Sequence, residues 1–189
     1  MLESLKPRWP VWLLALGLLA PAGAAEIDLE LRARLIEATA IEGGFDDRFA
    51  AEVWLTDMGS RIGRMVPDPA ERLTILRYVF AEAQRVELPP EMVLAVIEVE
   101  SAFDRWALSV AGARGLMQVM PFWVNEIGRP DDNLFDIPTN IRYGTTILRH
   151  YYDIERGNWW RALARYNGSL GQDWYPARVF RAYDRRWVD

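Results

Sequence analysis

The feature that most constrains the fold is the segment "VLAVIEVESAFD", residues 93–104, which is largely apolar and has helical rather than alternating periodicity. Pro90 stands just upstream, where a proline is tolerated at the start of a helix. At about 100° per residue, Val93, Val96 and Ile97 then form one apolar stripe. The chain has no cysteine, so its stability must come from a packed core, to which this helix contributes a face.

One carboxyl lies within that stripe. Glu100 falls on the apolar face, whereas Glu91 and Glu98 fall on roughly the opposite face, where we expect ordinary solvated charges. Glutamate is almost never fully buried without a partner. Glu100 is therefore paired with a buried arginine, placed at a helix end where the stripe meets water, or kept protonated for chemistry. Desolvation raises the pKa of a carboxyl, and a glutamate becomes a general acid near neutral pH in this way.

The N-terminus has the layout of a targeting sequence. Lys6 and Arg8 form a short basic region, and the apolar run at residues 11–20 has the length of a signal-peptide core. An A-x-A cleavage site ends at Ala24. We therefore expect residues 1–24 to be a cleavable signal peptide, with an uncleaved anchor as the alternative. No cysteine is present to carry a lipid anchor, so we expect no stable membrane insertion after cleavage.

Charge and length exclude some functions. Removal of Glu3, Lys6 and Arg8 with the signal peptide leaves 20 of the 22 basic and 26 of the 27 acidic residues, a formal net charge of −6. An acidic exported protein without a basic patch is not expected to bind nucleic acid. A chain of this length suits a single domain, and its 51% hydrophobic residues can build a core.

Most of the chain has helical periodicity, and no segment alternates for long enough to predict a strand. We expect residues 25–66 to form a helical N-terminal extension packed on the core. The main domain is expected to span residues 67–189. It opens on a helix with Asp68 as N-cap and Pro69 at the first helical position. Later helices alternate with proline, glycine and asparagine breaks.

Three segments after the apolar helix form a set: "ESAFDRWALSVAGARGLMQVMP" (100–121), "LFDIPTNIRYGTTIL" (134–148) and "ALARYNGSLG" (162–171). The set resembles, in order and spacing, the signature of lytic transglycosylases of the soluble, SLT-domain type. The resemblance covers about residues 86–189. It departs at the last segment, where Gly-Ser stands in place of the usual Ala-Gly. It implies a mainly α, lysozyme-like single domain of the goose-type lysozyme superfamily.

The resemblance also implies a reaction. Enzymes of this family cleave the β-1,4 bond between N-acetylmuramic acid and N-acetylglucosamine in peptidoglycan, without water, and leave a 1,6-anhydro product. Glu100 would be the single acid and base, because the nucleophile, the C6 hydroxyl, is already tethered to the substrate. The expected partner is the peptidoglycan glycan strand and the expected location is the periplasm. No cofactor or metal is expected.

Further site residues are carried over from the family's motifs one at a time. Ser109 matches a serine that faces the acid and the N-acetyl group of the substrate. Gln118 matches the glutamine of "GLMQ", whose amide can both donate and accept hydrogen bonds. Met120 matches a methionine that lines the sugar site. Tyr166 and Asn167 match the family's Tyr-Asn pair, with the tyrosine hydroxyl near the acid.

Gly112 and Gly115 of the first motif are expected to be turn glycines. His150 is the only histidine, which by itself makes no metal site. Several aspartates are candidates for a second carboxylate, although each is also in a position typical of turns and caps, namely Asp104, Asp131, Asp132 and Asp136.

Two other functions remain open from the sequence. One is a hydrolytic muramidase of goose-lysozyme type, which would use an aspartate across the cleft to activate water. The other is a non-catalytic wall-binding accessory of an envelope-spanning apparatus. The presence of Glu100 favours an enzyme over the accessory.

Overall fold

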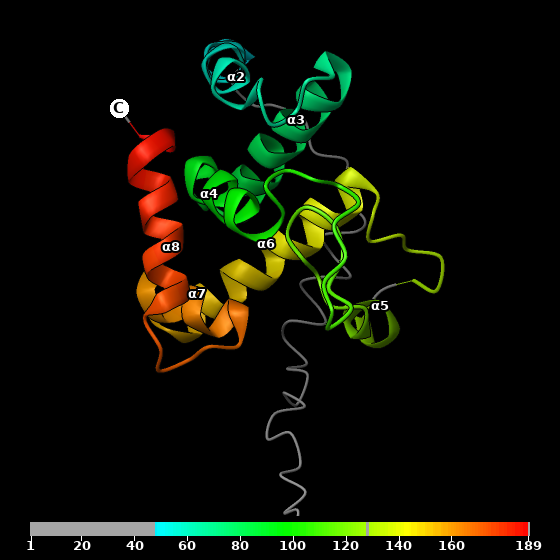
Figure 1. Cartoon of the computed structure of the whole chain (residues 1–189), viewed down its shortest axis with the longest axis vertical. Coiled ribbons are helices and arrows are strands. Elements are labelled where there is room, and N and C mark those ends of the chain that lie inside the picture. The colour runs from blue at the N-terminus through cyan, green and yellow to red at the C-terminus, as the bar shows by residue number, and fades with distance from the viewer. Residues whose placement is uncertain (1–47, 128, 189) are drawn as a thin grey trace, which may run out of the picture.

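The computed structural model describes residues 48–127 and 129–188 (Figure 1). The expected signal peptide and residues 25–47 of the expected extension lie outside these ranges. Within these ranges the chain forms seven α-helices and a closing π-helical turn: α2 Arg48–Ile62, α3 Pro69–Arg85, α4 Pro90–Ser101, α5 Phe122–Ile127, α6 Ile137–Ile154, α7 Trp159–Asn167, α8 Trp174–Ala182 and η1 Tyr183–Trp187.

The described residues contain no β-strand, only two isolated bridges, which join Arg114 to Leu108 and to Val119. The mainly α prediction is therefore confirmed. No helix within these ranges is both long enough and apolar enough to cross a bilayer. The expected cap of α3 is present, since the Asp68 carboxylate accepts a bond of 3.0 Å from the Ala70 backbone N–H.

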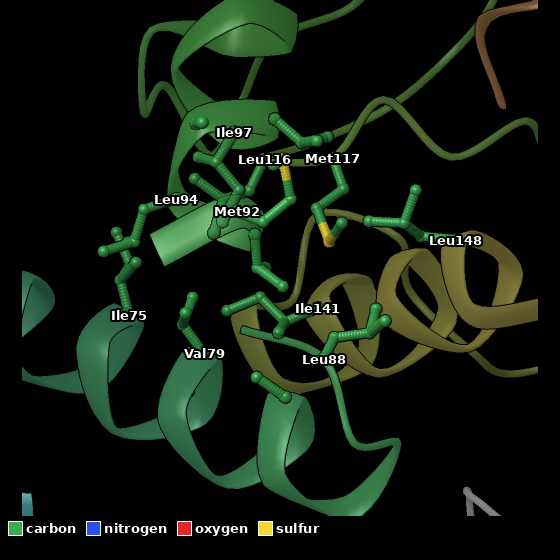
Figure 2. Packing of buried hydrophobic residues seen from close by; sticks show 14 of the residues in the cluster. Ile75, Val79, Leu88, Met92, Leu94, Ile97, Leu116, Met117, Ile141 and Leu148 are labelled. Atoms are coloured by element: carbon green, nitrogen blue, oxygen red, sulfur yellow. The ribbon is translucent and has the colours of Figure 1, made fainter. Parts of the chain in front are cut away.

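Helix α4 lies at the centre of the core and packs against α3 and the α8–η1 segment, while α6 packs against α3 (Figure 1). Every residue from 92 to 97 is buried, so the expected single stripe is in fact a helix covered on all sides over this stretch. In Figure 2, Leu94 lies toward Ile75 and Val79 of α3. Leu116 and Met117, from the loop after α4, pack over the same helix. This packing fixes the position of the residues at the C-terminal end of α4.

The prediction that Glu98 and Glu91 are solvated charges is wrong. Only 11% of the Glu98 side chain is exposed, and its carboxylate accepts hydrogen bonds from Arg185 at 2.6 Å and from the Trp187 indole at 3.0 Å. Glu91 accepts a bond of 2.6 Å from the indole of Trp54. Both carboxylates are covered because segments distant in sequence, α2 and η1, fold over the polar side of α4. Helical periodicity alone does not reveal such cover.

Helix α2 contributes to the same core. Met58 and Ile62 are buried, as is Val66 after the helix, and Arg61 donates a hydrogen bond of 2.8 Å to the backbone oxygen of Arg186. The boundary at residues 66–67 stays a prediction, because a core shared by α2 and α3 does not by itself define where a domain begins.

We expect removal of the residues before Pro67 to lower the melting temperature relative to the chain that begins at residue 25. Loss of Met58 and Ile62 from the core exposes apolar surface on α3 and removes about 3 kcal/mol or more of burial free energy. Thermal unfolding and light scattering measure the stability and the aggregation. A truncated protein with unchanged melting temperature and full activity would instead make α2 a partner-binding arm.

Candidate active site

Glu100 lies in the last turn of α4, where the chain leaves the helix through two left-handed residues, Ala102 (φ 51°) and Phe103 (φ 66°). Phe103 is buried and faces the indole of Trp187, with ring centroids 5.8 Å apart. Ser101 donates a hydrogen bond of 2.8 Å to the backbone oxygen of Leu116. These contacts anchor the helix end, so the Glu100 side chain is held at the edge of the core and is half-buried.

The carboxyl of Glu100 is hydrogen-bonded by a phenol. The Tyr175 hydroxyl donates to Oε1 of Glu100 at 2.5 Å. Burial raises the pKa of Glu100 to about 7, although the Tyr175 hydrogen bond and the positive charge of Arg178 both lower it. Among the three explanations for a carboxyl on the apolar face, the phenol partner and the raised pKa fit an acid that keeps its proton to higher pH than a solvated glutamate, rather than a buried ion pair.

Tyr175 is a site residue that the sequence did not indicate. It is 1% exposed, near the start of α8, and 75 positions from Glu100 in the chain. Its pKa is raised well above the usual range by burial and by the negative charge of Glu100. It lies outside the three motif segments, and the only local signal is a tyrosine on the buried side of a short helix, which is equally typical of a plain core residue.

Tyr166 of α7 lies close to the acid but is not hydrogen-bonded to it. Its hydroxyl donates to the backbone oxygen of Met117 at 2.8 Å. Burial, and next the negative charge of Glu100, raise its pKa well above the usual range. Asn167 is the last residue of the same helix and is half-buried. The structure therefore brings Tyr166 to the site, while Tyr175 makes the direct bond.

The loop between α4 and α5 carries the other expected binding residues. Several of their side-chain hydrogen bonds are made to the backbone of the loop itself. The side-chain nitrogen of Gln118 donates to the backbone oxygens of Ala107 and Gly115, both at 3.1 Å. The Ser109 hydroxyl accepts from the Ala113 N–H at 2.9 Å. Met120 is half-buried and packs against the core. Contact of these residues with a sugar stays a prediction; Gln118 retains its carbonyl oxygen and Ser109 its hydroxyl proton for such contact.

Asn140 of α6 fastens this loop to the helical core. It is 1% exposed, and its side chain accepts from the Met117 N–H at 2.8 Å. Its nitrogen donates to the backbone oxygens of Arg114 at 2.8 Å and Leu134 at 2.7 Å. Two of its hydrogen bonds thus reach the backbone at the "GLMQ" segment, and the third reaches Leu134, just before α6. The asparagine of the second motif therefore positions the loop that carries the first motif.

Three of the candidate second carboxylates are engaged within the protein. Asp104 accepts from the backbone N–H of Trp106, Asp132 from the hydroxyl of Tyr143, and Asp136 caps α6. In the described ranges, the groups that shift the pKa of Glu100 include no carboxylate. No group of three or more residues able to ligate a metal occurs in the same ranges.

Comparison with known proteins gives a family match over more than half of the chain. Residues 77–185 match the family described as "Transglycosylase SLT domain". This match includes α4, the loop after it and both tyrosines near Glu100, so the site that the fold assembles coincides with the matched region.

Three relatives and one solved structure illustrate the similarity. The transglycosylase of Enterobacteria phage PRD1 is 32% identical over 108 residues, which are 53% of this chain and 40% of the phage protein. Membrane-bound lytic murein transglycosylase C of Actinobacillus pleuropneumoniae serotype 5b is 51% identical over 82 residues, 37% of this chain and 22% of that protein. The soluble lytic murein transglycosylase of Escherichia coli K12 is 33% identical over 95 residues, which are 46% of this chain and 15% of that protein. The structure of lytic transglycosylase Slt from Pseudomonas aeruginosa has a TM-score of 0.44 at 32% identity and covers 58% of this chain and 17% of that one.

The similarity is to a part of each relative, since the matched region spans less than half of the length of each of these proteins. The two bacterial relatives are named lytic murein transglycosylases, and the phage protein is named a transglycosylase.

Proposed function

The chain belongs to the transglycosylase SLT-domain family, and we propose that it is a peptidoglycan lytic transglycosylase with Glu100 as its single acid and base. Its substrate would be the β-1,4 bond between N-acetylmuramic acid and N-acetylglucosamine. The observation that carries this proposal is the half-buried carboxyl of Glu100, whose pKa is raised to about 7, at the head of the family's first motif.

In the first step the protonated Glu100 gives its proton to the glycosidic oxygen as the bond from the anomeric carbon to that oxygen breaks. The N-acetyl group of the muramic acid can stabilise the positive charge at the anomeric carbon. Tyr175 supports this step because its hydrogen bond fixes the direction of the carboxyl. A raised pKa is what a general acid requires at neutral pH.

In the second step the Glu100 carboxylate takes the proton of the C6 hydroxyl while that oxygen bonds to the anomeric carbon. The product is a 1,6-anhydro sugar, and Glu100 is protonated again. No water is consumed, and one carboxyl suffices because the nucleophile belongs to the substrate. Most glycosidases instead need two carboxylates.

The proposal includes the cellular setting. We assign residues 1–24 as a signal peptide, residues 25–66 as an extension on the catalytic domain, and the periplasm as the location. Cell fractionation and N-terminal sequencing of the mature protein test the assignment, with Ala25 at the start of the mature chain as the expected result.

Mass spectrometry of the products of purified peptidoglycan tests the reaction. An anhydro product is lighter by one water than the hydrolytic muropeptide, and it supports the proposal. A hydrolytic product would make the protein a muramidase. Binding to the wall without any product, in a protein whose Glu100→Gln variant behaves identically, would make it a non-catalytic accessory.

The pH dependence of cleavage should report the pKa of Glu100. Because the free enzyme needs the proton on this carboxyl, kcat/KM should fall as the pH rises past about 7. In Tyr175→Phe the bond that favours the charged carboxylate is lost, so the pKa rises further and the fall in kcat/KM moves to higher pH. Tyr166 and Tyr175 stay neutral in this range because their own pKa values are raised.

Initial rates on soluble glycan strands across the pH range measure this profile. A fall of kcat/KM near the pKa of an exposed glutamate, about 4.3, would show a solvated carboxylate and contradict the role of Glu100 as acid. An unchanged profile in Tyr175→Phe would show that the hydroxyl does not influence the carboxyl.

A further inference from the structure

Arg178 is a cation beside the acid that the two-step reaction does not use. It follows Tyr175 by three residues, so it lies on the same side of α8, one turn further along. The Tyr175 hydroxyl bonds Glu100 at 2.5 Å, so the turn of α8 that ends at Arg178 borders the acid. In agreement, the positive charge of Arg178 lowers the pKa of both Glu100 and Tyr175. The side chain is exposed, so it is open to a ligand in solvent.

Two arginines after α8 have a carboxylate partner, whereas Arg178 has none among the residues that the structure describes. Arg185 and Arg186 both pair with Glu98. Within residues 48–127 and 129–188, Arg178 forms no ion pair of this kind. A guanidinium presents a planar fork of donors that matches a carboxylate with two parallel hydrogen bonds. Its donors near Glu100 are therefore available to an anion that the protein itself does not supply.

The position of Arg178 also opposes the proposed chemistry in the absence of a ligand. An acid must keep its proton, and a nearby cation favours loss of that proton. An anion of the bound substrate that pairs with the guanidinium would compensate the positive charge of Arg178. Glu100 would then keep its proton more readily when the substrate is bound. The expected substrate carries such anions, either on the lactyl ether of muramic acid or on an attached peptide stem.

We propose that Arg178 binds a carboxylate of the glycan strand next to the bond that Glu100 cleaves, and that this contact selects carboxylate-bearing strands over neutral ones. The proposal rests on the proposed function for its substrate class. The carboxylate could belong either to the lactyl ether or to the peptide stem. Strands with and without peptide stems distinguish these two sources.

Equilibrium binding tests the proposal without turnover, in protein that carries Glu100→Gln. The probes are peptide-free glycan strands, which carry free lactyl carboxylates, and strands with intact stems, each also prepared with its carboxylates converted to amides. Titration calorimetry at low salt compares three proteins: the Glu100→Gln protein, the same protein with Arg178→Gln, and the same protein with Arg181→Gln. Arg181 is the matched control because it is another exposed arginine of α8.

We expect Arg178→Gln to weaken binding of carboxylate-bearing strands by about fivefold, the size of a favourable exposed ion pair. It should leave binding of the amidated strands unchanged. Arg181→Gln should change neither. Loss on peptide-free strands identifies the lactyl carboxylate, and loss confined to stem-bearing strands identifies the peptide. The loss should shrink as salt is added.

The proposal would be overturned if Arg178→Gln weakened binding of the amidated strands as much as binding of the carboxylate-bearing strands. It would also be overturned if Arg178→Gln left the affinity for all four probes unchanged. The same loss in Arg181→Gln would also overturn it, because the effect would then be general surface charge. The proposed function is tested separately, because it fails if the unmodified protein forms no anhydro product. The role of Arg178 is tested by the binding measurements alone.

Discussion

Replacement of Glu100 by glutamine is expected to abolish cleavage of peptidoglycan and to leave the fold intact. Loss of a general acid typically lowers the rate by about 10²–10⁴-fold, and here the same residue also serves as the base. The fold should survive because glutamine has nearly the same shape and its carbonyl oxygen can still accept the hydrogen bond from Tyr175. Product formation from purified wall and thermal unfolding measure the two effects.

Glu91→Gln is the matched control, on the same helix. Glu91 accepts a hydrogen bond from the Trp54 indole, and a glutamine oxygen can accept it too. This variant should therefore keep its activity and nearly all of its stability. If Glu100→Gln retained activity while Glu91→Gln lost it, the assignment of the acid would be wrong.

Gly115→Ala is expected to be the most damaging small substitution in the loop after α4. Gly115 has φ +71°, a left-handed conformation that costs an L-residue about 1–2 kcal/mol. An added methyl group would also overlap the backbone oxygen of Leu134 and the side chain of Asn140. Because Asn140 holds the loop by two hydrogen bonds and Leu134 by a third, the shift needed to relieve the overlap disturbs them.

We expect Gly115→Ala to lower the free energy of unfolding by about 3 kcal/mol, from the strained backbone and the overlap together. Activity should fall as well, since Met117, Gln118 and Met120 follow in the same loop. Chemical denaturation and the cleavage assay measure both. Gly112→Ala is the control: its φ is +88°, but no atom lies within 4 Å of the added methyl group, so only the backbone cost remains. Equal stability of both variants would contradict the close approach at Gly115.

Local sequence determined the helices and the identity of the candidate acid. The caps, breaks and 3.6-residue periodicity around α3 and α4 depend on neighbours within a turn or two, so they can be read directly. Glu100 stood out because a carboxyl on an apolar helix face is anomalous without any knowledge of the fold. The family motifs indicated the candidate binding residues of the loop, because these residues stand at fixed sequence distances from Glu100.

The tertiary structure alone decided what surrounds these residues. Tyr175 reaches Glu100 across 75 positions, and the η1 residues cover Glu98 across 87 to 89 positions. Periodicity distinguishes the faces of α4 but carries no information about which distant segment will cover each face, so Glu98 was read as solvated. The proximity of Arg178 to the acid has the same origin. A helix pattern records which side of a segment is apolar, whereas the pKa of a carboxyl depends on the groups that the whole chain packs around it.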